Sequence, residues 1–421
     1  MRGGIVTEAT AHTADTAHAI DLMDLDPFET GRDAELFALL RDADPLHWNA
    51  EPDGGAGFWS VTRYDDVKAV ASDPELFTVV HGTQIPSRRA EGEGARSIHH
   101  VDPPEHGPLR RIASTHMRPA RVKDLEGDIR AVIDALLDDA VGAGDIDFVH
   151  SVSSQLPLVM IGRLLGAPLE DCPHLLRWTN QMASEDPDYS EGPETAVRAR
   201  DEAFAYFRGL EEQRRECPMD DLVSALAAAE LDGVPLQRGY LDAYYLILMV
   251  AGNETTRNLL SGGIAALAQN PQWWDAMRRD PDQIRVVVEE MVRWVTPVIS
   301  MRRTATRELE MHGKTIAAGD KVVMWFTSAN RDERAFERPD EFRGDRFPNE
   351  HLGFGWGTHA CLGANLARLE ARLFFERLIE RGLEVEVTAD PARLRSNFFR
   401  GIKRLPVRIQ QGGGAGGARR G

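Results

Sequence analysis

The dominant pattern in the sequence is helical, with apolar residues recurring three and four positions apart over long stretches. This spacing gathers apolar side chains on one face of an α-helix, which can then pack against a core. Strand-like stretches are fewer: GFWSV, which a helix follows, KVVMWFT and RLPVRI. The longest helical patterns cover residues 122–140, 151–165, 194–215, 239–269 and 281–295. The sequence therefore predicts a mainly α fold with a minor β portion.

The stretch 239–269 is far longer than an average globular helix of about 11 to 12 residues, so we expect it at the centre of the fold. Its apolar run YYLILMVAG is followed by the polar residues NETT at 253–256. Threonine hydroxyls can bond to the carbonyl four residues back and distort the helix, and Gly252 allows another group to approach the backbone. The alternative is a solvent-facing stripe on an amphipathic helix.

Both ends of the chain lack periodicity. Residues 1–25 are rich in Ala, Thr and His, and the tail GGGAGGARRG is mostly glycine. We expect disorder over 1–25 and 411–421. Between them no stretch has the composition of a linker, so we expect one domain over 26–410, and a monomer.

The composition, with 42% hydrophobic and 28% charged residues, is that of a globular protein. A net charge of −18 disfavours nucleic acid and anionic membranes as partners. The longest apolar run, 246–252, is well short of the roughly 20 residues that span a bilayer, and no signal-peptide core is present. We expect a cytoplasmic protein without a membrane anchor. Three cysteines are too few and too scattered for a disulfide framework.

One of these cysteines, Cys361, lies in the glycine-rich segment FGWGTHACLG at the start of a helix expected over 362–381. Backbone N–H groups at a helix start lower the pKa of a thiol, and the thiolate is the form that binds metals. Glycines would let the backbone lie flat against a planar ligand. Two alternatives stay open from these residues alone: an inert buried thiol, and a nucleophile near His359. Zinc is disfavoured, because no second cysteine is near.

The pattern F-x-x-G-x-x-x-C-x-G, formed by Phe354, Gly357, Cys361 and Gly363, resembles the heme-binding signature of the cytochrome P450 family. The resemblance implies a triangular, mainly α single domain that binds heme b, with Cys361 as the iron ligand. It also implies a heme-thiolate monooxygenase, an oxidoreductase that activates O2 and hydroxylates a C–H bond. Trp356 occupies a position where smaller or polar residues are common, which suggests altered packing beside the heme.

A second motif, AGNETT at 251–256, resembles the oxygen-binding groove in the long central helix of this family. By this resemblance Glu254 and Thr255 are the catalytic acid–alcohol pair that supplies protons during oxygen activation. Ala251 and Gly252 would border the cofactor, with Gly252 leaving room for dioxygen.

A third resemblance concerns a structural triad. Glu290 and Arg293 match the family's E-x-x-R, which in isolation would describe only a surface ion pair. Phe342 and Arg346, in RPDEFRGDR, match the segment that completes the triad. The implied role is to support the cysteine loop.

The fourth resemblance concerns the residues that bind the heme propionates in this family. His106 and Arg110, spaced four apart in DPPEHGPLRR, match a helix that binds one propionate. Arg303 and His359 match the other propionate-binding positions, and Arg302 is the competing choice for Arg303.

The remaining expectations concern partners and substrate. The resemblance implies electrons from a separate ferredoxin and an NAD(P)H-dependent ferredoxin reductase. A basic docking face could consist of Arg110, Arg111, Arg118, Arg121 and Lys123. The substrate is expected to be a hydrophobic small molecule such as a steroid, terpenoid, branched lipid or secondary metabolite. Candidate pocket residues are Val250, Val298, Ile299, Phe398 and Phe399.

Two other functions remain in competition. A peroxide-driven peroxygenase of the same fold would typically lack the pair Glu254 and Thr255. A non-catalytic heme sensor would not need the AGNETT motif.

Overall fold

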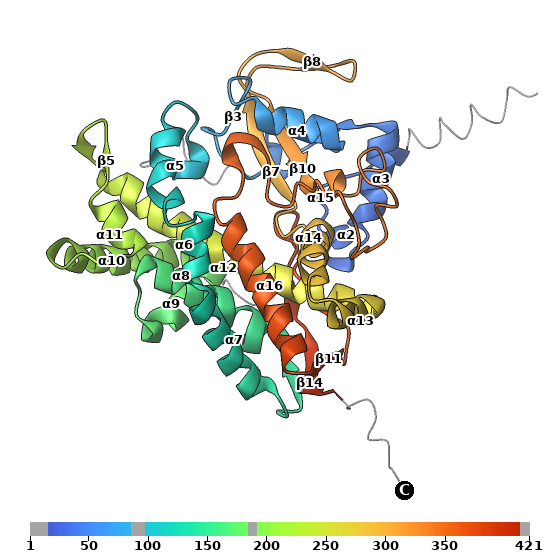
Figure 1. Cartoon of the computed structure of the whole chain (residues 1–421). Coiled ribbons are helices and arrows are strands. Elements are labelled where there is room, and N and C mark those ends of the chain that lie inside the picture. Colours follow the sequence, from blue (N-terminus) through green and yellow to red (C-terminus); the bar gives the residue numbers. More distant parts are fainter. Residues whose placement is uncertain (1–15, 86–96, 184–191, 413–421) are drawn as a thin grey trace, which may run out of the picture.

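Helix α12 (Arg238–Gln269), 32 residues long, runs through the middle of the molecule, as Figure 1 shows for this computed structural model. The structure describes residues 16–85, 97–183 and 192–412. α12 is buried along most of its length, which agrees with its apolar composition. It therefore acts as the common packing partner for helices on both sides.

Most of the described chain is helical. The helices before α12 are α2 (Asp26–Thr30), α3 (Asp33–Ala43), α4 (Tyr64–Ser72), α5 (His106–Ser114), α6 (Pro119–Asp124), α7 (Glu126–Ala140), α8 (Gln155–Leu165), α9 (Cys172–Ala183), α10 (Pro193–Glu216) and α11 (Leu222–Ala227). After it come α13 (Gln272–Arg279), α14 (Gln283–Val295), α15 (Phe326–Ala329) and α16 (Ala364–Glu380). Short 3-10 turns are η1 (Pro52–Gly54), η2 (Ile98–His100), η4 (Leu169–Asp171) and η5 (Gly357–His359), and η3 (Val149–Ser153) is a π-helix.

The main sheet has five strands in the order β1-β2-β10-β7-β3. They are β1 (Leu46–Asn49), β2 (Phe58–Val61), β3 (Phe77–Thr78), β7 (Ser300–Ala305) and β10 (Lys321–Trp325). β10 pairs in parallel with β2, and the other three pairings are antiparallel. Smaller sheets contain β4 (Asp145–Asp147), β5 (Glu230–Leu231), β6 (Val234–Pro235), β8 (Leu309–Met311), β9 (Lys314–Ile316), β11 (Leu383–Val387), β12 (Ala392–Arg393), β13 (Ile402–Arg404) and β14 (Pro406–Gln411). The mainly α fold with a minor β portion is thus confirmed.

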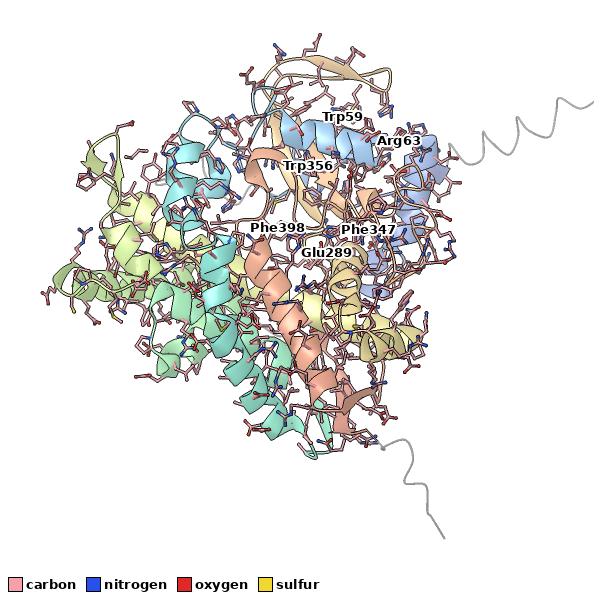
Figure 2. The ribbon with its side chains drawn as sticks, viewed as in Figure 1. Trp59, Arg63, Glu289, Phe347, Trp356 and Phe398 are labelled. Carbon is pink, nitrogen blue, oxygen red and sulfur yellow. The ribbon has the colours of Figure 1, made fainter. Side chains whose placement is uncertain are left out.

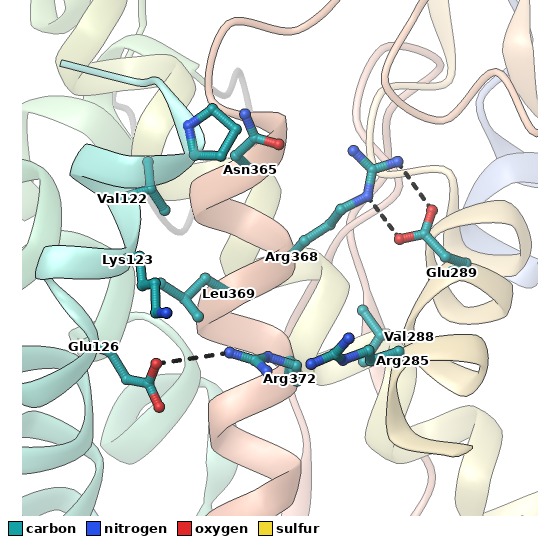
Figure 3. A pocket seen from close by; sticks show the side chains of 11 residues that line it. Val122, Lys123, Glu126, Arg285, Val288, Glu289, Asn365, Arg368, Leu369 and Arg372 are labelled. Atoms are coloured by element: carbon teal, nitrogen blue, oxygen red, sulfur yellow. Dashed lines mark hydrogen bonds and ion pairs between the residues drawn. The ribbon is translucent and has the colours of Figure 1, made fainter. Parts of the chain in front are cut away.

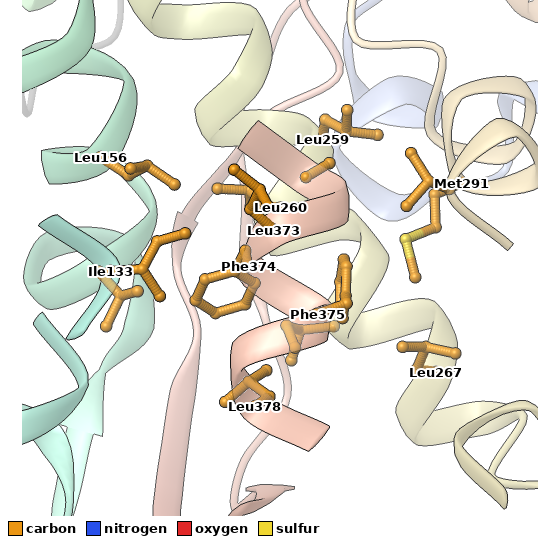
Figure 4. Packing of buried hydrophobic residues seen from close by; sticks show 14 of the residues in the cluster. Ile133, Leu156, Leu259, Leu260, Leu267, Met291, Leu373, Phe374, Phe375 and Leu378 are labelled. Carbon is orange, nitrogen blue, oxygen red and sulfur yellow. The ribbon is translucent and has the colours of Figure 1, made fainter. Parts of the chain in front are cut away.

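The largest apolar cluster forms where α12, α14 and α16 meet α7 and α8 (Figure 4). Phe374 and Phe375 of α16 are fully buried in it, with their rings 5.4 Å apart in an edge-to-face arrangement. A Cβ atom at Gly263 of α12 would lie 2.9 Å from Met291 Sδ, so glycine allows α12 and α14 to approach closely. This packing holds α16, the helix that follows the cysteine loop, against the core.

The predicted helices all exist, with differences at their ends. The pattern over 122–140 is two helices, α6 and α7, which meet at Leu125. The pattern over 151–165 begins in the π-helix η3 before α8 continues it. Apolar spacing reveals neither change, because it defines the ends of helices only to within one or two residues.

The polar residues in the middle of α12 do not interrupt the helix. Thr255 Oγ1 donates to the carbonyl oxygen of Ala251 at 2.9 Å, as expected, yet the helix continues without a break. Asn253 and Glu254 are buried, which excludes a solvent-facing stripe. By resemblance, Gly252 is expected to leave room for dioxygen. On the side where a side chain would project, this is wrong, because a Cβ at Gly252 would lie 2.9 Å from Ile161 of α8. Gly252 instead allows α8 to pack against α12.

Part of the expected N-terminal disorder is wrong. Residues 16–25 are described, and Ala17, Ile20 and Leu22 are buried in a cluster that includes Phe37 and Trp325. These apolar residues are too few to give a periodic pattern, although each contributes to burial. Residues 1–15 and 413–421 lie outside the described residues, whereas Gln411 belongs to β14.

Among the helices of the described ranges, none combines the length and apolar character that crossing a bilayer requires.

A buried carboxyl group in α16 leads to the first prediction. Burial raises the pKa of Glu370 to about 8. The unfolded chain ionises near pH 4.5, so between pH 4.5 and 8 the unfolded state binds fewer protons and the free energy of unfolding falls as pH rises. We expect Glu370→Gln to remove this loss of stability. Its free energy of unfolding should exceed that of the parent protein by an amount that grows by ~1.4 kcal/mol per pH unit and reaches a few kcal/mol near pH 8. Denaturant unfolding between pH 5 and 8 measures it.

Glu384→Gln, at an exposed position of β11, is the matched control and should leave the pH profile unchanged. Parallel pH profiles for the parent protein and Glu370→Gln would contradict the prediction.

Candidate functional site

The loop before α16 presents Cys361 between η5 and the helix. The Cys361 backbone N–H donates to the Phe354 carbonyl at 2.8 Å, which closes the loop. Gly357 has φ of 68°, and a Cβ there would lie 2.5 Å from the Ala71 carbonyl oxygen of α4. Glycine is therefore required at this position by both the backbone angle and the contact with α4.

Cys361 has accessible surface although protein surrounds it, so its thiol faces an internal space. Burial raises the pKa of this thiol, although the Gly363 N–H, Arg110 and Arg368 each act to lower it. The expectation that the helix start lowers the pKa of Cys361 is therefore wrong, because the pKa is raised instead. Desolvation outweighs the helix terminus, and a bound cation would be needed to favour the thiolate.

Four cationic or potentially cationic side chains gather beside this loop: His106 and Arg110 of α5, Arg303 of β7, and His359 of η5. The rings of His106 and His359 are 4.3 Å apart. Burial and then Arg303, His106 and Arg110 lower the pKa of His359 to about 3. Burial followed by Arg110 likewise lowers the pKa of His106. The four predicted residues are thus brought together.

This cluster has donors without matching acceptors. The Nε2 atoms of His106 and His359 are buried and have no hydrogen-bond partner. Burial lowers the pKa of Arg303 to about 10, and Asp102 only partly opposes this. Buried cations are normally paired, so the cluster is suited to an anionic group that enters from the internal space. Two propionates of a heme have the required charge and acceptor atoms.

The choice between Arg302 and Arg303 follows from their opposite directions on β7. Arg302 donates to the Gln84 carbonyl at 3.4 Å and to Thr304 Oγ1 at 3.3 Å. Arg303 lies close enough to His359 to lower its pKa. Arg303 is therefore the residue that joins the cluster.

On α12, Ala251 is exposed and Thr255 is half-buried on the same helix face. Ala251 is thus accessible within a largely buried helix, as the predicted groove would require. Glu254 points elsewhere: its carboxylate accepts from Arg257 and from Asn258 Nδ2, the latter at 3.1 Å. Glu254 and Thr255 are thus not brought together, since successive helix positions differ by about 100°.

The predicted triad is present and closed. Arg293 donates to both Glu290 carboxylate oxygens at 2.8 Å, and Arg346 Nε donates to Glu290 Oε2 at 3.0 Å. Glu290 and Arg293 are fully buried. The Arg293 guanidinium also donates to the carbonyls of Asn330 and Pro339, at 2.6 and 2.9 Å. The triad thereby fixes the irregular chain that leads to the cysteine loop.

Phe342, the remaining member of the predicted structural set, packs edge-to-face against Trp294 with the ring centroids 5.9 Å apart. It belongs to the main apolar cluster.

A second ionic contact near the loop was missed by sequence reasoning. Glu289 accepts from Arg368 of α16 at 2.6 Å and contacts His351 Nε2 at 3.0 Å. Burial acts to raise the pKa of Glu289, but His351 and Arg368 outweigh it and lower the value to about 2. The Arg368 guanidinium also lies 4.3 Å from the Phe354 ring centroid. Only the adjacency of Glu289 to the E-x-x-R motif could have indicated this contact.

Trp356 lies below α4 in the view of Figure 2. The residue is 39% exposed, and Lys68 Nζ of α4 is 4.2 Å from its ring centroid. The expectation that Trp356 alters packing beside the heme is therefore not supported, because the side chain packs against α4.

The candidate pocket residues differ in accessibility. Val250, Val298 and Phe398 are half-buried, and Phe399 is 6% exposed with its ring 4.4 Å from that of Phe398. Ile299 is 2% exposed and packs in the cluster that contains Trp325. Ile299 therefore belongs to the core, because consecutive residues of an extended segment point in opposite directions.

Comparisons with known proteins agree with this geometry. The family model described as "Cytochrome P450" matches residues 194–409. Linalool 8-monooxygenase of Pseudomonas putida is 37% identical over 384 residues, which cover 89% of this chain and 94% of that protein. A steroid C26-monooxygenase of Rhodococcus jostii is 35% identical over 418 residues, covering 96% and 88%.

Among solved structures, cytochrome P450 CYP268A2 of Mycobacterium marinum, in complex with pseudoionone, aligns with a TM-score of 0.83 and 34% identity. The alignment covers 90% of this chain and 95% of that one. The fold and the cysteine loop thus define a heme-thiolate oxidoreductase. The chain belongs to the cytochrome P450 family and is a monooxygenase whose cofactor is heme b.

The triad supports a stability prediction. Glu290→Gln removes the carboxylate that compensates two buried guanidinium groups, so we expect the free energy of unfolding to fall by about 3–5 kcal/mol. Denaturant unfolding of the heme-loaded protein measures the change. Asp275→Asn, which breaks an exposed ion pair with Arg278, is the control and should cost at most ~0.5 kcal/mol. Equal losses in the two variants would show that the buried network does not stabilise the fold.

Proposed function

We propose that this chain hydroxylates an apolar small molecule of the terpenoid or steroid class, with electrons delivered by a separate ferredoxin and its NAD(P)H-dependent reductase. Cys361 is the iron ligand in this proposal. The observation that carries it is the group of His106, Arg110, Arg303 and His359, in which both histidine Nε2 atoms lack a hydrogen-bond partner and Asp102 only partly offsets the burial of Arg303. Bound heme supplies the oxygen-activating redox chemistry, and the protein residues supply position, charge and protons.

Thr255 and Glu254 take different parts in proton supply. Thr255 lies on the accessible face with Ala251, so its hydroxyl can hold a proton or a water molecule beside the cofactor. Glu254 is occupied by Arg257, which also donates to Asn180 of α9 at 2.9 Å. Glu254 must exchange the Arg257 contact for water before it can deliver a proton from the exterior. This pair favours O2 over peroxide as the oxidant, and a catalyst over a sensor.

The substrate class rests on the apolar character of the accessible candidates. Val250, Val298 and Phe398 offer no charge or hydrogen-bond donor in their side chains, so binding would depend on apolar burial. The relatives are named for linalool and steroid oxidation, and one solved structure holds pseudoionone. An apolar ligand with few polar groups agrees both with the candidate pocket residues and with the names of the relatives.

The electron donor is proposed to dock on the outside of the molecule near the start of α16. A groove of about 700 Å³ lies there between α6, α14 and α16 (Figure 3). Its floor is apolar, with Val122, Val288 and Leu369, and its walls include Lys123 and Arg285. α16 begins three residues after Cys361, so a protein bound in this groove contacts the helix that follows the iron ligand.

The expected docking residues are not equivalent. Arg110 points inward and donates to the Ala360 carbonyl at 2.6 Å. Arg121 is exposed but forms a 2.5 Å ion pair with Asp220. Arg111, Arg118 and Lys123 are exposed and form no ion pair within the part of the chain that the structure describes. We therefore assign docking to these three residues and exclude Arg110 and Arg121.

The first test concerns the iron ligand and the reaction. With heme bound and reduced, the CO complex should have the red-shifted Soret band of thiolate ligation, and Cys361→Ala should lose it. Cys217→Ala, at an exposed cysteine, is the control and should keep the band. With ferredoxin, reductase and a terpenoid substrate, O2 consumption should match the formation of alcohol.

Turnover with H2O2 but not with the reductase system would identify a peroxygenase instead. Heme binding without substrate-dependent O2 consumption across terpenoids and steroids would indicate a sensor.

The second test concerns docking. Arg118→Glu combined with Lys123→Glu should slow reduction by an acidic ferredoxin at low salt by at least ~10-fold, with a smaller salt dependence, because steering charge is reversed. Stopped-flow reduction under CO measures the rate. Arg307→Glu combined with Arg279→Glu, two exposed positions away from the groove, is the matched control. Unchanged rates in the groove variant, with dithionite reduction normal, would exclude this face.

A further inference from the structure

A cluster of two histidines and one aspartate lies apart from the cysteine loop. His47 is in β1, Asp44 follows the end of α3, and His18 belongs to the first described segment. Asp44 and His47 are 5% and 2% exposed, whereas the His18 side chain is 64% exposed. None of these residues has a part in the proposed oxygen chemistry.

The two ring nitrogens of His47 both face acceptors. Nε2 is 2.8 Å from the carbonyl oxygen of Ile20, which can only accept, so Nε2 carries a hydrogen. Nδ1 is 2.9 Å from Asp44 Oδ2, which accepts as a carboxylate. With Nε2 as the donor, Nδ1 is the ring nitrogen available to bind a cation beside Asp44 Oδ2. An N–H donated to a backbone carbonyl is also the usual outer contact of a metal-ligating histidine.

A second histidine nitrogen converges on the same carboxylate oxygen. His18 Nδ1 is 3.4 Å from Asp44 Oδ2, and the three ligand atoms of the cluster all lie within 4.8 Å of one another. Tetrahedral zinc with bonds of about 2.0–2.1 Å separates its ligand atoms by about 3.3 Å. Only small side-chain shifts would bring the three atoms to that spacing.

The other carboxylate oxygen of Asp44 is already engaged. Lys314 Nζ donates to Asp44 Oδ1 and also to the Leu46 carbonyl, the latter at 2.8 Å. This contact orients the carboxylate and leaves Oδ2 directed toward the two histidines. Imidazole and carboxylate ligands suit zinc(II) and its neighbours among the transition metals.

We propose that His18, Asp44 and His47 form a zinc(II) site, with water as the fourth ligand. The ion binds His47 Nδ1, Asp44 Oδ2 and His18 Nδ1, and it joins the N-terminal segment to α3 and β1. That segment also contacts the substrate side of the fold, because Asn397 Nδ2, next to Phe398, donates to the Leu22 carbonyl at 3.0 Å. Zinc would therefore stabilise residues 16–25 against the wall that carries Phe398.

The test uses the full chain with heme bound, so that Cys361 is occupied. After chelator treatment, zinc is titrated in competition with a chromophoric chelator. We expect one tightly bound equivalent, and His18→Ala should weaken it by at least about 100-fold, the upper end of effects seen for mere outer-shell changes. His18 is largely exposed, so this variant should fold normally.

His312→Asn is the matched control. His312 forms a comparable 2.7 Å pair with Asp66 but lies outside any three-ligand cluster of the described residues. Its φ of 51° is also tolerated by asparagine. Zinc affinity should be unchanged in this variant.

Two structural readouts complete the experiment. X-ray absorption at the zinc edge should show two imidazole ligands, and hydrogen exchange of residues 16–25 should slow on zinc addition in the parent protein but not in His18→Ala. Equal zinc affinity in the parent and His18→Ala, or exchange that zinc does not change, would show that the cluster is only an ion pair.

Discussion

The buried carboxylate of Glu290 is the interaction on which the cysteine loop depends. It accepts from two guanidinium groups, Arg293 and Arg346, and also from Asn349 Nδ2 at 3.1 Å and the Arg343 N–H at 2.8 Å. One carboxylate cannot satisfy ten guanidinium hydrogens, so the remaining donors bind backbone carbonyls between residues 330 and 341. A stretch with little regular structure thereby acquires a single conformation. The chain then continues directly into the loop that presents Cys361.

The charge balance beside Cys361 is the opposite of that at Glu290. At Glu290 the protein supplies both signs of charge and closes the network within itself. Beside Cys361 it supplies His106, Arg110, Arg303 and His359. Burial lowers the pKa values of all four, and Asp102 only partly opposes this at His106 and Arg303. Buried donors without acceptors cost free energy, so this arrangement is stable only when an anionic partner enters. The same reasoning explains why the thiol pKa is raised before a cation binds it.

Sequence reasoning correctly predicted which residues lie together where a motif fixes their spacing along the chain. Cys361 in its glycine loop, the Glu290 and Arg293 pair, and His106 with Arg110 are such cases. It failed where partners come from distant elements: the contact of Glu289 with Arg368 joins α14 to α16, and Gly252 is required by Ile161 of α8. Residues 16–25 were also missed, since their burial depends on surfaces formed by α3 and β10.

Helix geometry explains why the two residues proposed for proton supply need not touch. One turn of α12 offers different environments: Thr255 and Ala251 face the accessible side, Gly252 faces α8, and Glu254 faces Arg257 and Asn258. The Glu254 carboxylate is held by the Arg257 guanidinium, on a different side of α12 from Thr255. The proposed proton supply therefore requires the contact between Glu254 and Arg257 to open, independently of how Thr255 is positioned.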